Sequence, residues 1–244
     1  MKGSSIVSRD TEPELVSVER TLTIALGSVE LEADLCIPPG ARAVVLFAHG
    51  SGSSHRSPRN QFVAAALRER GLGTLLFDLL TPAEERRDEP HARLRFDIPF
   101  LAERVGAATD WLRLHDATKD LQLCYFGAST GAAAALVAAA ERPLEVNAVV
   151  SRGGRPDLAR NALNCVRAPT MLIVGEDDHM VLQLNRQALE RLPGPKQLVI
   201  VPGASHLFEE PGALEEVARA AGDWFLANLR IGAPGQPLSH LSER

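Results

Sequence analysis

The sequence predicts an α/β fold with a mostly parallel, doubly wound sheet of about eight strands and helices on both faces. Short, continuous apolar runs alternate with longer segments of helical period through most of the chain. Strands without polar alternation are typical of parallel sheets, because helices cover both faces of such sheets. The chain has 244 residues, of which 45% are hydrophobic and 23% are charged. These values suit a globular domain with a large core.

The individual elements follow from local patterns in chain order. Residues 18–25 and 29–37 alternate apolar and polar side chains around a turn at Gly27, which predicts an antiparallel hairpin at one edge of the sheet. The other predicted strands are residues 43–48, 74–77, 121–126, 147–150, 170–174 and 197–201. The predicted helices are residues 58–70, 96–115, 132–140, 181–192 and 212–229.

These elements imply one domain over residues 13–231, between a flexible N-terminus at residues 1–12 and a flexible tail at residues 232–244. The segment between the strands that end at 150 and begin at 170 is too short for a separate lid domain. Residues 81–95 are dense in Glu and Arg. A solvated surface loop is the favoured interpretation of this charged segment, and a loop that gates a site is the alternative.

Composition and charge argue against several classes of partner. The net charge is −5 and no basic stripe is present, so we do not expect nucleic acid as a partner. The longest apolar runs fall short of the ~20 residues of a membrane-spanning helix, and residues 1–11 lack the apolar core of a secretory signal.

Three cysteines cannot all pair, which favours a reducing, cytoplasmic setting. No Cys/His group has metal-ligand spacing, so we expect neither a metal nor a cofactor.

The most informative motif is Gly127-Ala128-Ser129-Thr130-Gly131, between a predicted strand and a predicted helix. A G-x-S-x-G sequence in that position is typical of a nucleophile elbow, a sharp turn that projects the serine hydroxyl out of the fold. The backbone N–H groups at the start of the following helix stabilise negative charge. Ser129 is therefore the candidate nucleophile.

A serine nucleophile needs a general base, and the base needs a third group that orients it. In a doubly wound sheet such groups gather at the carboxyl ends of the strands. The run Glu176-Asp177-Asp178 follows one predicted strand, and His206 follows the next. His206 is the candidate base, and the acid comes from the preceding run.

Four segments together resemble the motifs of the α/β-hydrolase superfamily, in the order that this family uses. They are FAHGSGS at residues 47–53, GASTG at 127–131, VGEDDHMV at 174–181 and PGASH at 202–206. The short layout resembles the dienelactone-hydrolase-like branch, here with a serine nucleophile, and the resemblance covers residues 18–229. It implies an α/β-hydrolase fold without a lid domain. Similar domains occur fused to phosphoribosyltransferases, which suggests a role beside a partner enzyme.

The resemblance also assigns residue roles. Family sequences resemble Gly-x-x-Asp-x-x-Val at the acid turn, which favours Asp178 over Asp177. The superfamily builds half of its oxyanion hole in the loop after the strand at 43–48, so the implied donors are the backbone N–H groups of Ser51 and Thr130. Dienelactone hydrolases proper resemble G-x-C-x-G at the elbow. Serine in that position argues for general ester or thioester hydrolysis and against a dienelactone substrate.

Two arginines are candidates for binding an anionic group of the substrate. Arg152 follows the strand at 147–150, and Arg59 lies just past the implied oxyanion loop. A planar guanidinium binds a carboxylate or a phosphate through several donors at once. The competing interpretation is a structural salt bridge, for instance between Arg155 and Asp157.

We therefore expect a serine hydrolase that cleaves carboxylic ester or thioester bonds of a small acyl substrate through an acyl-enzyme, with Ser129, Asp178 and His206 as the catalytic residues. Two alternatives stay open. One is a peptidase or acyltransferase that uses the same three residues, and the other is a non-catalytic ligand-binding module on the same fold. The three residues in this chain order favour an enzyme over a binding module.

Overall fold

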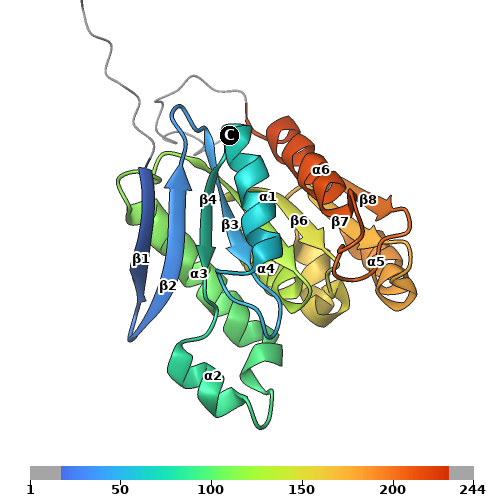
Figure 1. Cartoon of the computed structure of the whole chain (residues 1–244), viewed down its shortest axis with the longest axis horizontal. Coiled ribbons are helices and arrows are strands. Elements are labelled where there is room, and N and C mark those ends of the chain that lie inside the picture. Colours follow the sequence, from blue (N-terminus) through green and yellow to red (C-terminus); the bar gives the residue numbers. More distant parts are fainter. Residues whose placement is uncertain (1–17, 231–244) are drawn as a thin grey trace, which may run out of the picture.

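One mostly parallel sheet organises the chain (Figure 1). The computed structural model describes residues 18–230, so the ends predicted to be flexible and the outer limits of the predicted domain lie outside the described residues. Eight strands pair in the order β1-β2-β4-β3-β5-β6-β7-β8. The strand β2 pairs antiparallel with β1 and β4, and the remaining pairs are parallel. The predicted fold class and the predicted edge hairpin are both confirmed.

The strands lie close to their predicted positions. Their bounds are β1 (Val18–Leu26), β2 (Val29–Ile37), β3 (Ala43–Ala48), β4 (Gly73–Phe77), β5 (Gln122–Ala128), β6 (Val146–Arg152), β7 (Thr170–Gly175) and β8 (Lys196–Val201). The strands β3, β4, β6 and β7 are buried along their whole length. Complete burial explains why these strands appear in the sequence as continuous apolar runs.

Helices cover both faces of this sheet. Their bounds are α1 (Pro58–Glu69), α2 (Pro82–Asp88), α3 (Ile98–Leu114), α4 (Thr130–Glu141), α5 (His179–Arg191) and α6 (Ala213–Ala227), with 3-10 segments η1 (Leu94–Phe96) and η2 (Pro156–Cys165). Figure 1 shows α1 and α6 on one face and α3 and α4 on the other. Each face has its own apolar core, with Val63, Leu67 and Phe225 on the α1 side and Val105 and Leu136 on the α3 side. Within residues 18–230, no helix is long and apolar enough to cross a bilayer.

The structure differs from the sequence-based expectation in the charged segment at residues 81–95. This segment contains α2, which begins with a reciprocal capping box between Thr81 and Glu84. The pattern Thr-x-x-Glu is a known helix start. The helix was not predicted because the residues that follow are few and highly charged and show no apolar period. In Figure 1, α2 extends beyond the carboxyl edge of the sheet.

Candidate active site

The predicted elbow has the backbone geometry of a tight strand-to-helix turn. Ser129, between β5 and α4, has φ 50° and ψ −119°, a strained conformation that a non-glycine residue adopts only when its surroundings impose it. A Cβ on Gly127 would collide with the backbone of Ala132, and a Cβ on Gly131 would collide with the carbonyl of Ala48. Close packing around the turn therefore explains both glycines of the motif.

Backbone hydrogen bonds hold this turn against the end of β6. The N–H of Ser129 donates to the carbonyl of Arg152 at 3.2 Å, and the N–H of Arg155 donates to the carbonyl of Ser129 at 3.1 Å. Within residues 18–230, the Ser129 hydroxyl makes no hydrogen bond with another side chain. The backbone of Ser129 is thus held in place, and its hydroxyl has no side-chain partner among the described residues.

The loop after β3 lies directly against the elbow. An ideal Cβ on Gly50 would lie 3.0 Å from the Ser129 Cβ, so a larger residue there would push the loop and the elbow slightly apart. The N–H of Ser51 donates to Thr130 Oγ1 at 2.9 Å. Thr130 occupies the first position of α4, where backbone N–H groups have no partner within the helix. The two predicted oxyanion donors are therefore neighbours. The Ser51 N–H is already engaged, because it donates its hydrogen bond to the Thr130 hydroxyl.

His206 and Asp178 come together from the ends of two neighbouring strands. Nδ1 of His206, after β8, lies 2.5 Å from Oδ2 of Asp178, after β7. Asp177 is exposed, and its backbone N–H donates to the carbonyl of Ala204 at 3.0 Å. A Cβ on Gly175 would collide with the same carbonyl. The close approach of the two loops thus orients Asp178, and not Asp177, toward the imidazole.

The end of β6 connects the two halves of the candidate site. Gly153 has φ 51°, and an ideal Cβ there would lie 3.2 Å from the His206 carbonyl and 3.5 Å from its ring carbon Cε1. The preceding residue, Arg152, accepts the hydrogen bond from Ser129. Ser129 therefore lies against Arg152, at the end of β6, and His206 lies against the next residue, Gly153.

A cleft of about 730 Å³ opens beside the elbow. The loop after β3 and Thr130 form one wall, and the charged segment at residues 81–95 forms another through Glu85, Arg86, Glu89 and Arg95. A cleft of this volume falls in the range of small-molecule sites. The charged segment is therefore a wall of the cleft as well as part of the surface.

Asp88 fixes the shape of that wall. Its carboxylate accepts hydrogen bonds from the backbone N–H of Leu94 at 2.6 Å and from Nε of Arg95 at 2.7 Å. Burial alone would raise the pKa of Asp88, but these hydrogen bonds and the Arg95 charge lower it to about 2. The carboxylate therefore stays ionised and holds the segment in place.

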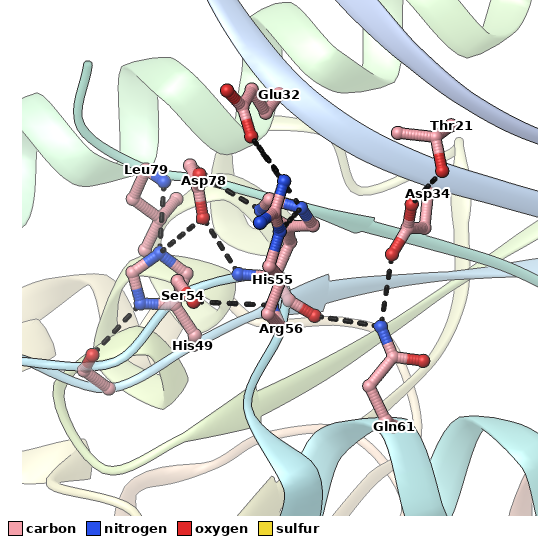
Figure 2. A network of polar contacts seen from close by, with 11 residues as sticks. Thr21, Glu32, Asp34, His49, Ser54, His55, Arg56, Gln61, Asp78 and Leu79 are labelled. Atoms are coloured by element: carbon pink, nitrogen blue, oxygen red, sulfur yellow. Dashed lines mark hydrogen bonds and ion pairs between the residues drawn. The ribbon is translucent and has the colours of Figure 1, made fainter. Parts of the chain in front are cut away.

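A second polar network, shown in Figure 2, supports the loop after β3 from the side of β4. His49 is buried; its Nδ1 donates to the Gly50 carbonyl at 2.9 Å, and its Nε2 accepts from the Leu79 N–H at 3.0 Å. Both ring nitrogens are engaged as in a neutral imidazole. Burial lowers the pKa of His49, outweighing the opposite effects of the Gly50 hydrogen bond and Asp78. His49 is thus a structural support.

His55 occupies the centre of this network. Its Nδ1 lies 2.9 Å from Oδ2 of Asp78, out of line for a well-directed hydrogen bond, and its Nε2 accepts from Arg56 Nε at 3.2 Å. Glu32, His55 and Asp78 offer ligand atoms within 4.8 Å of one another, as a cation site would. The guanidinium of Arg56, 3.1 Å from Glu32, already supplies the positive charge there. Sequence analysis missed this network because its members lie on separate elements.

The three arginines considered in the sequence analysis differ in their partners. Arg155 pairs with Asp157 at 2.8 Å, which is the structural salt bridge that the sequence suggested. Arg59 lines the cleft and pairs with Glu209 at 3.2 Å. Arg152 is buried, and its guanidinium donates a 3.4 Å hydrogen bond to the side chain of Asn60.

Comparison with known proteins agrees with this architecture. A family model described as an alpha/beta hydrolase domain matches residues 41–221. The crystal structure of a dienelactone hydrolase from Anabaena variabilis is 57% identical, covers 88% of this chain and 99% of its own, and has a TM-score of 0.86. An alpha-beta serine hydrolase homologue from Coxiella burnetii, 20% identical, covers 90% and 99% with a TM-score of 0.69, which shows the shared fold.

One curated relative is about twice as long as this chain. A Mycobacterium tuberculosis protein named "Putative phosphoribosyl transferase" is 53% identical over 211 residues, which are 86% of this chain and 47% of the relative. The chain thus spans about half the length of that relative. The family match covers most of the chain, and the sheet order and the strained elbow agree with it. The chain belongs to the α/β hydrolase family, and within it to the dienelactone-hydrolase-like proteins.

Proposed function

We propose that this chain is a serine hydrolase that cleaves ester or thioester bonds of a small acyl substrate. Ser129 attacks the acyl carbonyl, His206 accepts the serine proton and later donates it to the leaving group, and Asp178 holds the imidazole in the required tautomer. An acyl-enzyme forms, and water then releases the acid. The single observation that carries the proposal is the 2.5 Å contact between His206 and Asp178 at the same sheet edge as the strained Ser129.

The charge that develops on the substrate oxygen needs donors that are already in position. The backbone N–H of Thr130 at the start of α4 and the N–H of Ser51 are the proposed donors. The Ser51 N–H now donates to the Thr130 hydroxyl, so that hydroxyl rotates away when substrate binds. Removing one such donor typically lowers kcat by ~10²- to 10³-fold.

The names of the relatives bear on this proposal in different ways. The Anabaena variabilis protein is called a dienelactone hydrolase, which supports hydrolysis. Because dienelactone hydrolases proper resemble G-x-C-x-G and this chain has Ser129, a dienelactone substrate is not part of the proposal. The transferase name belongs to a relative about twice as long. We therefore attach no phosphoribosyl transfer to this chain.

The proposal includes a reducing, cytoplasmic location and no nucleic-acid partner. Cys36, Cys124 and Cys165 are all free, and burial raises the pKa of the Cys124 thiol to about 12. Unpaired cysteines are common in a reducing compartment. The net charge of −5 supports small-molecule partners over nucleic acid.

Hydrolysis of p-nitrophenyl butyrate and labelling by a fluorophosphonate probe test the proposal directly. The wild-type protein should do both, and Ser129→Ala should do neither. Cys165→Ser, which changes an exposed thiol, is the matched control and should behave as wild type. Wild-type protein that neither hydrolyses the ester nor reacts with the probe would point to the binding module. Cleavage of a peptide, or acyl transfer to an added alcohol in preference to water, would favour the peptidase or acyltransferase alternative.

A further inference from the structure

Arg152 carries a buried charge that lacks an acidic partner within residues 18–230. The residue ends β6 and is 8% exposed. Its Nη2 makes one long hydrogen bond to Asn60, and its guanidinium lies 5.9 Å from the centre of the Phe208 ring. Its Nε and Nη1 have no hydrogen-bond partner among the described residues. Buried charged donors are normally satisfied, so two unmet donors on one guanidinium indicate a missing acceptor.

A second guanidinium, that of Arg59, adds to the positive charge that lacks an acceptor. Burial, and after it the charge of Arg59, lower the pKa of Arg152 to about 10. Nε of Arg59 also has no hydrogen-bond partner in the part of the chain that the structure describes, and the Glu209 carboxylate that contacts Arg59 belongs to a side chain that is 64% exposed. An exposed ion pair of this kind contributes little and exchanges readily. The next acid, Glu210, has its pKa lowered by a hydrogen bond from Ser205 and forms no ion pair with Arg152 in the described chain.

The two arginines lie beside the candidate reaction site. The carbonyl of Arg152 accepts the hydrogen bond from the Ser129 N–H, and Phe208 lies two residues after His206. Asn60 lies in the first turn of α1, whose N-terminus favours negative charge. Arg59 lines the cleft beside the loop after β3. Arg152 is not among the residues that line this cleft, so an anion held by Arg59 would meet the charge of Arg152 from the buried side, together with the N-terminus of α1.

We propose that Arg152 and Arg59 form a binding site for an anionic group of the substrate, a carboxylate or a phosphate, next to Ser129. The inference rests on the proposed hydrolase function and specifies its substrate class: an ester or thioester whose acyl or leaving group carries a negative charge. When the substrate binds, Arg59 exchanges Glu209 for the anion, and Arg152 gains the acceptor that it lacks.

Anion binding can be measured without turnover in the Ser129→Ala protein. Succinate and inorganic phosphate, each added at constant ionic strength, should bind saturably by calorimetry and raise the unfolding temperature. Adding Arg152→Gln should weaken binding by ~10- to 100-fold, as expected for a lost hydrogen bond to a charged group, whereas Arg152→Lys should retain part of it. Arg219→Gln, which removes an exposed arginine on α6, controls for net charge and should change nothing. Tighter binding of succinate or of phosphate identifies the anion.

Kinetics then connect the site to substrate choice. Wild-type protein should prefer p-nitrophenyl hemisuccinate to neutral p-nitrophenyl butyrate, and Arg152→Gln should lower the ratio of their kcat/KM values by ~10-fold or more. An unchanged ratio, or anion binding that persists in Arg152→Gln, overturns the inference. If Ser129→Ala still hydrolyses both esters, the proposed function fails, and the calorimetric result continues to decide the anion site by itself.

Discussion

Two histidine–aspartate pairs lie at the carboxyl edge of this sheet, and they differ in what surrounds the imidazole. His206 is 2.5 Å from Asp178, and its side chain is 39% exposed. His55 is 2.9 Å from Asp78, but its side chain is 2% exposed. Arg56 donates to Nε2 of His55, whereas Nε2 of His206 has no partner in the described part of the chain. A general base needs this nitrogen free and accessible, so only the His206 pair has the surroundings of a base.

The two networks also differ in what they hold in place. Asp78 accepts the backbone N–H of His55 at 2.7 Å, and His49 accepts the N–H of Leu79. These contacts tie the loop after β3 to the end of β4. Asp178 instead makes its contact across two loops, with an imidazole at the surface of the site. One pair supports a backbone, and the other contains the proposed catalytic base.

Substituting Asp178 and Asp78 separately tests most directly whether the two pairs have different roles. Asp178→Asn should lower kcat by ~10⁴-fold because the amide favours the wrong imidazole tautomer, while the unfolding temperature changes little. Ester hydrolysis and a thermal melt on the same sample measure both quantities. Asp177→Asn is the matched control and should retain wild-type activity. Equal losses in Asp177→Asn and Asp178→Asn would remove the basis for choosing Asp178.

Asp78→Asn should have the opposite profile. Loss of the carboxylate leaves the His55 backbone N–H and its ring less well satisfied in a buried setting, at a cost of about 1–3 kcal/mol in the free energy of unfolding. Urea denaturation measures the cost. The folded fraction should keep kcat within ~10-fold of wild type. A folded, stable Asp78→Asn protein that has lost activity would instead assign this network a part in the chemistry.

The pH dependence of stability should carry the signature of His49. Because burial lowers the pKa of His49 below the usual value of about 6.5, the unfolded chain takes up a proton before the folded chain does. The stabilisation is complete above pH ~6.5 and is lost as the pH falls through the lowered pKa. His49→Gln should therefore show a flatter dependence of the unfolding free energy on pH as the pH falls below ~6.5. Parallel pH profiles for both proteins would contradict this account.

Arg56→Met should have the smallest effect. Its side chain is 71% exposed and its partner Glu32 is 52% exposed, and exposed ion pairs contribute ~0–1 kcal/mol. The substitution frees Nε2 of His55 without making it accessible. Urea denaturation should show a change within that range, and ester hydrolysis should stay as in wild type. If the variant gains a metal-dependent rise in unfolding temperature, the group formed by Glu32, His55 and Asp78 holds a cation once the guanidinium is gone.

The sequence by itself determined the strand order along the chain, the alternation with helices and the elbow. These features are written locally, as continuous apolar runs and as two glycines that close packing at Ala132 and Ala48 requires. The helix α2 escaped prediction because a short, charged helix that borders a cleft has no strong apolar period.

Only the tertiary structure decided which side chains meet. The family motif already favoured Asp178 over Asp177, but the physical reason lies in the tertiary structure, where Gly175 packs against the loop before His206 and Asp178 contacts the imidazole. The isolation of Arg152 depends on how β6 packs beside α1, and the burial of His55 against Asp78 depends on the loop after β3 meeting the end of β4. Burial and hydrogen-bond satisfaction are properties of neighbours distant in sequence, and local patterns carry no record of them.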